Sequence, residues 1–195
     1  ILVDEYQDTS DIQEDVITLL GHNNIYMVGD IKQSIYRFRH ANPSLFLHKF
    51  NSYIEIKNSS DLDIIPNNVG VKINLNKSFR SRREVVDTIN ENFSKLMNKE
   101  ESVIDYLDGH NFEFGKKDYD DNVCTNQNYS TEVYGYDTTK NGDIKTEAEI
   151  VADDIIHKIN NGYMVFDGKK LIKATFKDFC IIVDRKTNFK DILEI

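Results

Sequence analysis

Short apolar runs alternate with amphipathic stretches over the first 30 residues of the chain. Residues 1–3 and residues 25–28 are apolar, and each run predicts a short buried strand. Between them, Ser10 and Gln13 have the spacing of a capping box, and apolar residues at helical intervals follow until Gly21. Strand, helix and strand at this spacing predict a compact βαβ unit with parallel strands and a right-handed crossover.

The pattern predicts further elements beyond residue 40. Helices are expected over residues 42–50, from an Asn-Pro start, over residues 81–97, from a capping box at Ser81 and Glu84, and from residue 146 to Gly162. Strands are expected over residues 71–75, 132–136 and 179–183. Residues 51–70 are interpreted as a polar loop, and residues 100–130 as an acidic insertion or mobile loop. The fold class is therefore α/β.

Polar side chains follow both strands of the predicted βαβ unit. Asp4 and Glu5 end the first strand, Asp30 ends the second, and Gln33 lies just beyond it. Because the carboxyl ends of parallel strands meet at one edge of a sheet, where α/β proteins bind ligands, we expect these residues at a ligand edge. An apolar strand ending in Asp-Glu is typical of the Walker-B arrangement, in which the first acid holds Mg²⁺ and the second orients the attacking water. The pattern alone is not specific, since most such strand ends are ordinary acidic turns.

The segment GDIKQSIYRFR, residues 29–39, alternates aromatic and cationic side chains at its end. Gln33 lies where a neutral amide could contact a γ-phosphate or the attacking water. Tyr36 and Phe38 are flanked by Arg37 and Arg39, and rings flanked by guanidinium groups are typical of sequence-tolerant binding to single-stranded DNA. Packing of both rings in the core is the alternative.

A third segment, LNKSFRSRREV, covers residues 75–85. Arg80 lies just before a predicted helix, where it could reach a phosphate as an arginine finger, and Phe79 beside it could cover an adenine. An ordinary surface arginine is the alternative.

Charge and composition change this interpretation only in part. The chain has 195 residues and a net charge of −9, so its overall field does not attract nucleic acid. Residues 31–54, however, contain no acid and several cations. Two cysteines are too few for a disulfide framework or a metal cluster, and no run approaches the ~20 apolar residues of a membrane span. From the low cysteine content we expect the protein to reside in a reducing cytoplasm.

Taken together, in this order and spacing, the three segments resemble motifs II, III and IV of the superfamily 1 DNA helicases of the UvrD/Rep group. They look closest to the AddA component of the AddAB (RexAB) helicase–nuclease, whose motif III is similar to GDIKQSIYRFR. The UvrD branch usually has an acid where Lys32 stands and a Trp where Phe38 stands. Ser78 and His40 depart from the usual Asn and Gly. The segments LFLHKF, residues 45–50, and DFCIIVDR, residues 178–185, also resemble AddA.

The resemblance implies RecA-like parallel sheets in two partial domains. Residues 1–72 would form the C-terminal part of the first domain, and residues 73–195 the N-terminal part of the second, with the acidic insertion near residues 100–130. It also implies the following roles: catalysis by Glu5, Gln33 and Arg80; a metal contact by Asp4; ATP contacts by Asp4, Asp30, Gln33, Phe79 and Arg80; and DNA contacts by Tyr36, Phe38, Arg39 and Arg185.

The resemblance implies a 3′–5′ DNA helicase/exonuclease that uses ATP and Mg²⁺. It also implies that this protein is one component of a complex in the bacterial cytoplasm. Such a component couples ATP hydrolysis to translocation on single-stranded DNA and to duplex unwinding in double-strand break repair and recombination. Its expected partners are single- and double-stranded DNA and a second component that is AddB/RexB-like. The alternatives are a UvrD-like repair helicase without nuclease and a catalytically silent RecA-like module. Because the 195 residues contain no GxxxxGK[ST] loop, we expect a fragment that is inactive by itself.

Overall fold

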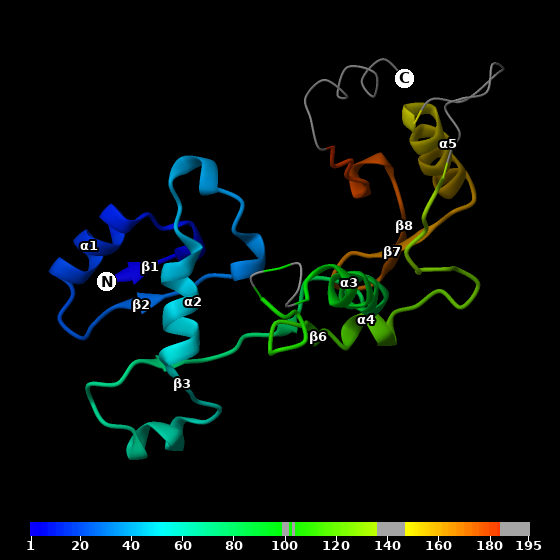
Figure 1. Cartoon of the computed structure of the whole chain (residues 1–195). Coiled ribbons are helices and arrows are strands. Elements are labelled where there is room, and N and C mark those ends of the chain that lie inside the picture. Colours follow the sequence, from blue (N-terminus) through cyan, green and yellow to red (C-terminus); the bar gives the residue numbers. More distant parts are fainter. Residues whose placement is uncertain (99–101, 103, 136–146, 184–195) are drawn as a thin grey trace. The chain divides into compact units, whose positions relative to one another are not determined.

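The computed structural model describes residues 1–98, 102, 104–135 and 147–183, and these residues form an α/β structure of helices and short strand pairs (Figure 1). The chain divides into two compact units, Ile1–Leu75 and Asn76–Ile195. Three of the four strand pairs in the described residues are parallel, and the fourth is an antiparallel hairpin. The assignment of the two units to RecA-like domains stays a prediction.

The first unit begins with the expected βαβ arrangement. Strands β1 (Leu2–Val3) and β2 (Tyr26–Met27) are parallel, and α1 (Asp11–Leu20) connects them. The capping box is confirmed: the Ser10 hydroxyl accepts from the backbone N–H of Gln13, and the Gln13 side chain accepts from the backbone N–H of Ser10 at 2.9 Å. The helix ends at Gly21, as expected. Local signals therefore determine this part of the fold.

The second half of the first unit is more ordered than the sequence indicated. Helix α2 (Pro43–Ser52) is confirmed, with its start capped by Asn42. Strand β3 (Ile54–Glu55) pairs in parallel with β4 (Val71–Lys72), and the 3₁₀ helix η4 (Ser59–Ile64) lies between them in the chain. The interpretation of residues 51–70 as a plain loop is therefore wrong, because a strand and a capped turn both form within it. The strand expected over residues 71–75 is limited to the two residues that pair.

A hydrogen-bonded cluster joins three elements of the first unit. The Tyr6 hydroxyl, at the end of β1, donates to Glu14 of α1 at 2.6 Å, and Lys49 of α2 forms an ion pair with the same carboxylate at 2.8 Å. Burial alone would raise the pKa of the Glu14 carboxyl, but the bonds from Lys49 and Tyr6 outweigh it and hold that pKa below its usual value. Tyr6 itself is 1% exposed. The cluster fixes both helices relative to the strand end.

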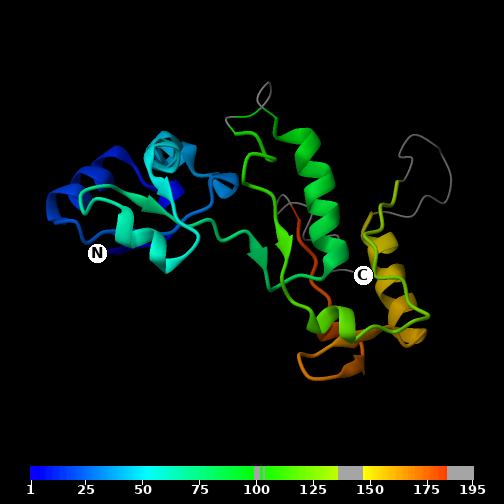
Figure 2. The same cartoon turned by 90° about the horizontal axis from the view of Figure 1, so that it is seen from below.

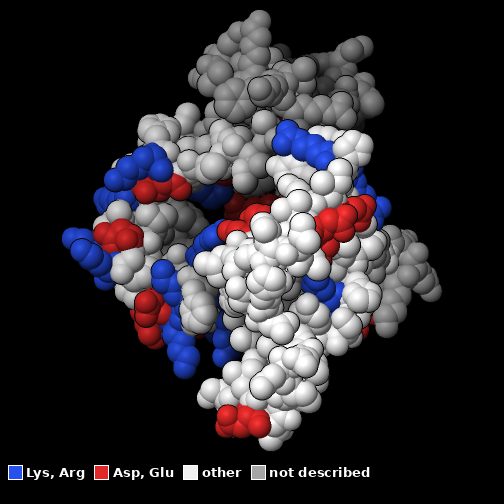
Figure 3. Space-filling view, turned by 90° about the vertical axis from the view of Figure 1, so that its left-hand side faces the viewer, with Lys and Arg blue, Asp and Glu red and all other residues white. Residues whose placement is uncertain are grey.

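The apolar face of α1 is largely open to solvent. Ile12, Leu19 and Leu20 are 77%, 80% and 62% exposed, and none of the residues of α1 is buried. In the face shown in Figure 3, a broad uncharged area lies beside Lys and Arg side chains that gather along one side with acids among them. The stripe that predicted the helix therefore covers no core within the described residues.

The second unit contains a parallel pair, a hairpin and three helices in its described residues. Strand β5 (Lys77–Ser78) pairs with β6 (Glu113–Phe114), and α3 (Arg83–Leu96) lies beside β6 (Figure 2). Helix α4 (Asp118–Asp121) and helix α5 (Glu147–Asn160) follow. Strands β7 (Met164–Phe166) and β8 (Leu171–Lys173) form the antiparallel hairpin, and the 3₁₀ helix η5 (Phe176–Asp178) comes after it.

Several expectations for the second unit are wrong. Helix α3 forms, but the capping box at Ser81 does not: its N-cap is Arg82, which has no side-chain cap, and the Glu84 carboxylate accepts from the Arg82 guanidinium at 3.3 Å instead. The mobile-loop interpretation of the acidic segment is wrong for its described residues, because they supply β6 and the fully buried Tyr106, whose ring stacks on Phe93 of α3. The interpretation of the segment as an insertion stays a prediction.

Two expected strands are absent from their described residues. No strand forms over residues 132–135 or residues 179–183. Val133 and Ile182 in these segments are 92% and 91% exposed, so neither of these two side chains packs against the described core. An apolar run predicts a strand only where a neighbouring strand completes its hydrogen bonds.

Candidate functional site

The end of β1 carries two acidic side chains beside an open groove. Asp4 is exposed, and its Oδ1 accepts from the backbone N–H of Glu5 at 2.9 Å. Glu5 has a left-handed backbone, with φ of 50° and ψ of 43°. Both acids, together with Asp8 and Thr9, line a groove of about 610 Å³ that runs between β1 and α1. The structure therefore presents two neighbouring carboxylates at the strand end that the sequence indicated.

A buried amide that sequence reasoning missed links this strand end to the next one. Gln7 is 1% exposed, and its Nε2 donates to Glu5 Oε2 at 2.7 Å and to Asp8 Oδ2 at 3.3 Å. Its Oε1 accepts from the backbone N–H of Asp30 at 2.9 Å. Periodicity provides no signal for a buried glutamine, because the amide is placed by partners 2 and 23 residues away.

At the end of β2, Asp30 organises the short helix η2 (Ile31–Gln33). Its Oδ1 accepts from the backbone N–H of Lys32 at 3.0 Å and pairs with the Lys32 ammonium at 2.8 Å, while its Oδ2 accepts from Gln33 Nε2 at 3.0 Å. Burial would raise the pKa of the Asp30 carboxyl, but the bonds from Lys32 and Gln33 outweigh it and hold that pKa below its usual value. Glu5, Gln7, Asp30 and Gln33 thus form one hydrogen-bonded chain.

The aromatic–cationic segment beyond Gln33 is exposed. Phe38 and Tyr36 are 73% and 37% exposed, and their ring centroids lie 5.8 Å apart. The Arg39 guanidinium lies over both rings, 5.2 Å from the Tyr36 centroid and 5.5 Å from that of Phe38. Residues Arg37–Arg39 form a 3₁₀ turn rather than an extended stretch, yet the two rings still lie together. Neither ring is therefore buried among the described residues, which disfavours core packing there, whereas DNA contact stays a prediction.

Phe79 and Arg80 lie just after β5, in the second unit. The Phe79 ring is 62% exposed and lies against Gly115, where an added Cβ would be 2.8 Å from the ring. Arg80 is exposed, and its backbone carbonyl accepts from the Tyr119 hydroxyl at 3.2 Å. Convergence of these two residues with the strand ends of the first unit stays a prediction. Arg185 lies outside the described residues.

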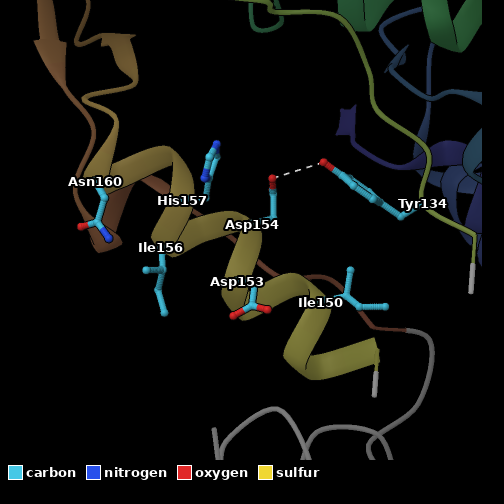
Figure 4. A pocket seen from close by; sticks show the side chains of 7 residues that line it. All are labelled: Tyr134, Ile150, Asp153, Asp154, Ile156, His157 and Asn160. Atoms are coloured by element: carbon cyan, nitrogen blue, oxygen red, sulfur yellow. Dashed lines mark hydrogen bonds between the residues drawn. The ribbon is translucent and has the colours of Figure 1, made fainter. Parts of the chain in front are cut away.

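A second groove, of about 570 Å³, lies along α5 (Figure 4). Tyr134 faces Asp154 across it, and their side chains form a hydrogen bond of 3.3 Å. Lys158 binds both Asp154 and Glu132, each at 2.7 Å. No sequence pattern indicated this groove. Because its central carboxylate is already engaged by a lysine and a tyrosine, we assign no chemistry to it.

Among the described residues, no group of three or more His, Cys, Asp or Glu side chains is arranged to hold a metal ion. Magnesium in nucleotide sites needs only one or two carboxylates, because phosphates and water supply the other ligands. The exposed carboxylate of Asp4 fits that mode of binding. Separately, none of the helices in the described ranges has the length and apolar character to cross a membrane.

Comparison with known proteins indicates first the class of protein that the N-terminal part of the chain resembles. Residues 1–54 match the model of the UvrD/REP helicase N-terminal domain. These residues include the ends of β1 and β2 and the exposed ring pair. The resemblance stated from motifs II and III is therefore confirmed for the first unit.

The relatives are more specific. Over nearly its whole length, the chain is similar to the AddA proteins, which are the A component of enzymes named ATP-dependent helicase/nuclease. It is 37% identical to that of Exiguobacterium sibiricum in an alignment 192 positions long, which covers 94% of this chain and 15% of the relative. It is 33% identical to that of Staphylococcus haemolyticus in an alignment 207 positions long, gaps included, which covers 100% of this chain and 16% of the relative. It is 46% identical to that of Clostridium kluyveri in an alignment 110 positions long, which covers 54% of this chain and 8% of the relative. The chain thus spans about one sixth of the length of the first two relatives.

Proposed function

We propose that this chain forms part of an ATP-dependent DNA helicase/nuclease that couples ATP hydrolysis to movement along single-stranded DNA. One observation carries the proposal. A hydrogen-bonded chain runs from Glu5 through Gln7 and Asp30 to Gln33, and the exposed rings of Tyr36 and Phe38 follow within five residues. Groups suited to phosphate chemistry therefore lie only a few residues along the chain from groups suited to base stacking.

The strand ends would serve the ATP half of this activity. Glu5 would orient the attacking water, and Gln33 would contact the γ-phosphate or that water. Asp4 would hold Mg²⁺, which neutralises charge on the β- and γ-phosphates when bound. Arg80 would act as an arginine finger, and Phe79 would cover the adenine. The GxxxxGK[ST] loop that cradles phosphates is not among the 195 residues, so hydrolysis needs a chain segment beyond them.

The ring pair would serve the DNA half. Base–aromatic stacking tolerates any sequence because every base has a π-face. Arg39, held over both rings, places a cation where a phosphate backbone would pass. Acids are absent from residues 31–54, so no nearby carboxylate in this segment of the sequence opposes an approaching phosphate.

Lys32 supports assignment to the helicase–nuclease branch over a UvrD-like helicase without nuclease. Its ammonium pairs with Asp30 at 2.8 Å, and an acid at this position would face the Asp30 carboxylate instead. We extend the proposal to 3′–5′ unwinding and exonuclease action in double-strand break repair, with an AddB/RexB-like component as partner. A catalytically silent module is disfavoured because Asp4, Glu5, Gln33 and Arg80 are all present.

The test is the Glu5→Gln variant in the full-length protein that carries this sequence. It should bind ATP but lose DNA-stimulated hydrolysis, because an amide cannot accept the proton of the attacking water. Asp15→Asn removes one acid from an exposed position on α1 and is the matched control, with wild-type turnover expected. Phosphate release by Glu5→Gln at the wild-type rate would refute the proposal.

A further inference from the structure

We propose that Gln7 is a positioning residue that holds the Glu5 carboxylate in its working orientation and ties it to the end of β2. The inference deepens the proposed function, because it rests on Glu5 acting on the attacking water. Gln7 would touch neither nucleotide nor water, and would act only through Glu5.

The hydrogen-bond partners fix the orientation of the Gln7 amide. The backbone N–H of Asp30 can only donate, so the amide atom 2.9 Å from it is the oxygen. The carboxylates of Glu5 and Asp8 can only accept when ionised, so the NH₂ group faces them. A flipped amide would bring donor against donor and acceptor against acceptor. The amide therefore has one satisfied orientation, with all three of its bonds made inside the protein.

Glu5 needs such a tether because of its own position. It is exposed, and a glutamate side chain that is free in solvent samples several rotamers. The buried Gln7 amide donates to Oε2 of Glu5 at 2.7 Å, and this bond does not involve Oε1 of Glu5. A charge-assisted bond of this length from a buried donor restricts the carboxylate to one direction. Glu5 can then present its second oxygen to a water at a defined place.

The strand next to Gln7 is shaped to admit its amide. A Cβ added at Gly29 would lie 2.6 Å from Gln7 Oε1 and 3.1 Å from its backbone nitrogen. The Phe46 ring would lie 3.0 Å from the same Cβ, so no space exists for a side chain here. Only glycine allows the end of β2 to approach the amide this closely. The close approach at Gly29 accompanies the hydrogen bond from the backbone N–H of Asp30, and together they hold the Gln7 amide against the end of β2.

Gln7 also connects Glu5 to the segment that carries the rings. Its oxygen holds the backbone of Asp30, and the Asp30 carboxylate holds the Gln33 amide at 3.0 Å. A change at either end of this chain must stretch or break a bond that Gln7 makes. Gln7 therefore sets the relative position of the two groups, Glu5 and Gln33, that the proposed mechanism requires to act together.

The test replaces Gln7 with Glu in the full-length protein that carries this sequence. The introduced carboxyl has the same size and keeps an oxygen for the backbone N–H of Asp30, but when ionised it donates nothing to Glu5. At pH 8 the kcat for DNA-stimulated ATP hydrolysis should fall about 10- to 100-fold while the KM for ATP changes less than about 2-fold. Burial and two neighbouring carboxylates raise the pKa of the introduced carboxyl, so its protonation on acidification restores a donor. The kcat of the variant relative to the wild type should then rise as the pH falls.

A second variant, Gln7→Met, has similar volume and no donor at any pH. It should show the same loss of kcat without recovery on acidification, and it carries the test if Gln7→Glu does not fold. Tyr6→Phe is the matched control for stability. Tyr6 is also 1% exposed and adjacent, but its hydroxyl binds Glu14 and not Glu5. It should lower the melting temperature and leave kcat unchanged.

Two outcomes separate the inference from the proposed function. If Glu5→Gln abolishes turnover while both Gln7 variants keep the wild-type kcat, the positioning role is wrong and the proposed function stands. If Glu5→Gln keeps wild-type turnover, the proposed function fails and the inference fails with it. A loss of kcat in Gln7→Glu that is the same at every pH would show a structural role only and would also overturn the inference.

Discussion

Replacing Phe38 with Ala in the full-length protein is expected to weaken binding to single-stranded DNA without removing basal ATP hydrolysis. Phe38 is the more exposed ring of the pair and follows Gln33 by five residues. Its loss removes a stacking surface and leaves the Glu5–Gln33 chain of hydrogen bonds intact. Unwinding should therefore fail while the chemistry of the strand ends continues.

The expected effect on binding is of the same size as the expected effect on folding, so both free energies must be measured. Stacking on one base contributes about 1–3 kcal/mol, which corresponds to a roughly 5- to 150-fold loss of affinity. Because Phe38 is 73% exposed, only about a quarter of its side chain is buried. A quarter of roughly 200 Å², at about 25 cal/mol per Å², is about 1.3 kcal/mol of folding free energy. The contact with Arg39 adds a few tenths to about 1 kcal/mol.

The assay is fluorescence anisotropy with a labelled oligothymidine at fixed salt, because affinities for DNA depend steeply on ionic strength. Phe176→Ala is the matched control: the ring is 68% exposed but lies in η5 of the second unit, outside the aromatic–cationic segment. It should lose a similar amount of stability and no DNA affinity. Thermal unfolding of both variants separates the two effects.

One result would refute this reasoning. If Phe38→Ala binds the oligonucleotide with wild-type affinity but unfolds many degrees lower than Phe176→Ala, the ring contributes to folding and not to DNA binding. The exposed ring of Phe38 would then have to pack against another part of the full-length protein.

The proposed phosphate contacts and the Asp30 ion pair allow three more tests. Arg80→Ala in the full-length protein should lower ATP turnover by a factor on the order of 10³, as loss of an arginine finger does. Near-normal turnover of this variant in a phosphate-release assay would contradict the arginine-finger role of Arg80. The 195-residue chain by itself should release no phosphate from ATP, since it has no GxxxxGK[ST] loop; hydrolysis that disappears in Glu5→Gln would contradict this. The pKa of Asp30 lies below its ordinary value of 3.8, so its ion pair stabilises the fold above that value and the contribution is lost as the pH falls through the lower folded-state pKa. Asp30→Asn should therefore unfold at a lower temperature than the wild type at pH 6, and the difference should shrink below about pH 4; a constant difference would contradict the assignment.

The parts of the fold that the sequence predicted are those determined by neighbours in the chain. The βαβ order, the Ser10–Gln13 box and the start of α2 all depend on contacts within a few residues. The pattern at Ser81 satisfied the same rule and failed, because an arginine next to the helix start took the glutamate into an ion pair. Capping residues predict a helix start only when their side chains have no stronger partner.

The parts that could not be predicted depend on residues far apart in the chain. Lys77 pairs with Glu113 across 36 positions, and the acidic surroundings of β6 conceal the apolar residues that bury Tyr106. For the candidate site, the sequence indicated the exposed groups, Asp4, Glu5 and Phe38, because motifs consist of such residues. It could not indicate the buried Gln7, whose role depends on the close approach of Gly29. Buried residues that position a functional side chain are therefore harder to infer from sequence than the functional side chain itself.

The left-handed backbone of Glu5 has a consequence for how this position can be changed. A residue other than glycine at φ of 50° is less stable by about 1–3 kcal/mol, and asparagine tolerates this conformation better than glutamate. Glu5→Asn should therefore gain backbone stability at the same time as it removes the carboxylate. The same substitution leaves the buried Gln7 amide without its Glu5 partner, which costs about 1–3 kcal/mol. Where the backbone gain exceeds that cost, selection of variants for heat resistance alone would accept Glu5→Asn and lose the proposed hydrolysis, so engineering at this position must screen for both properties.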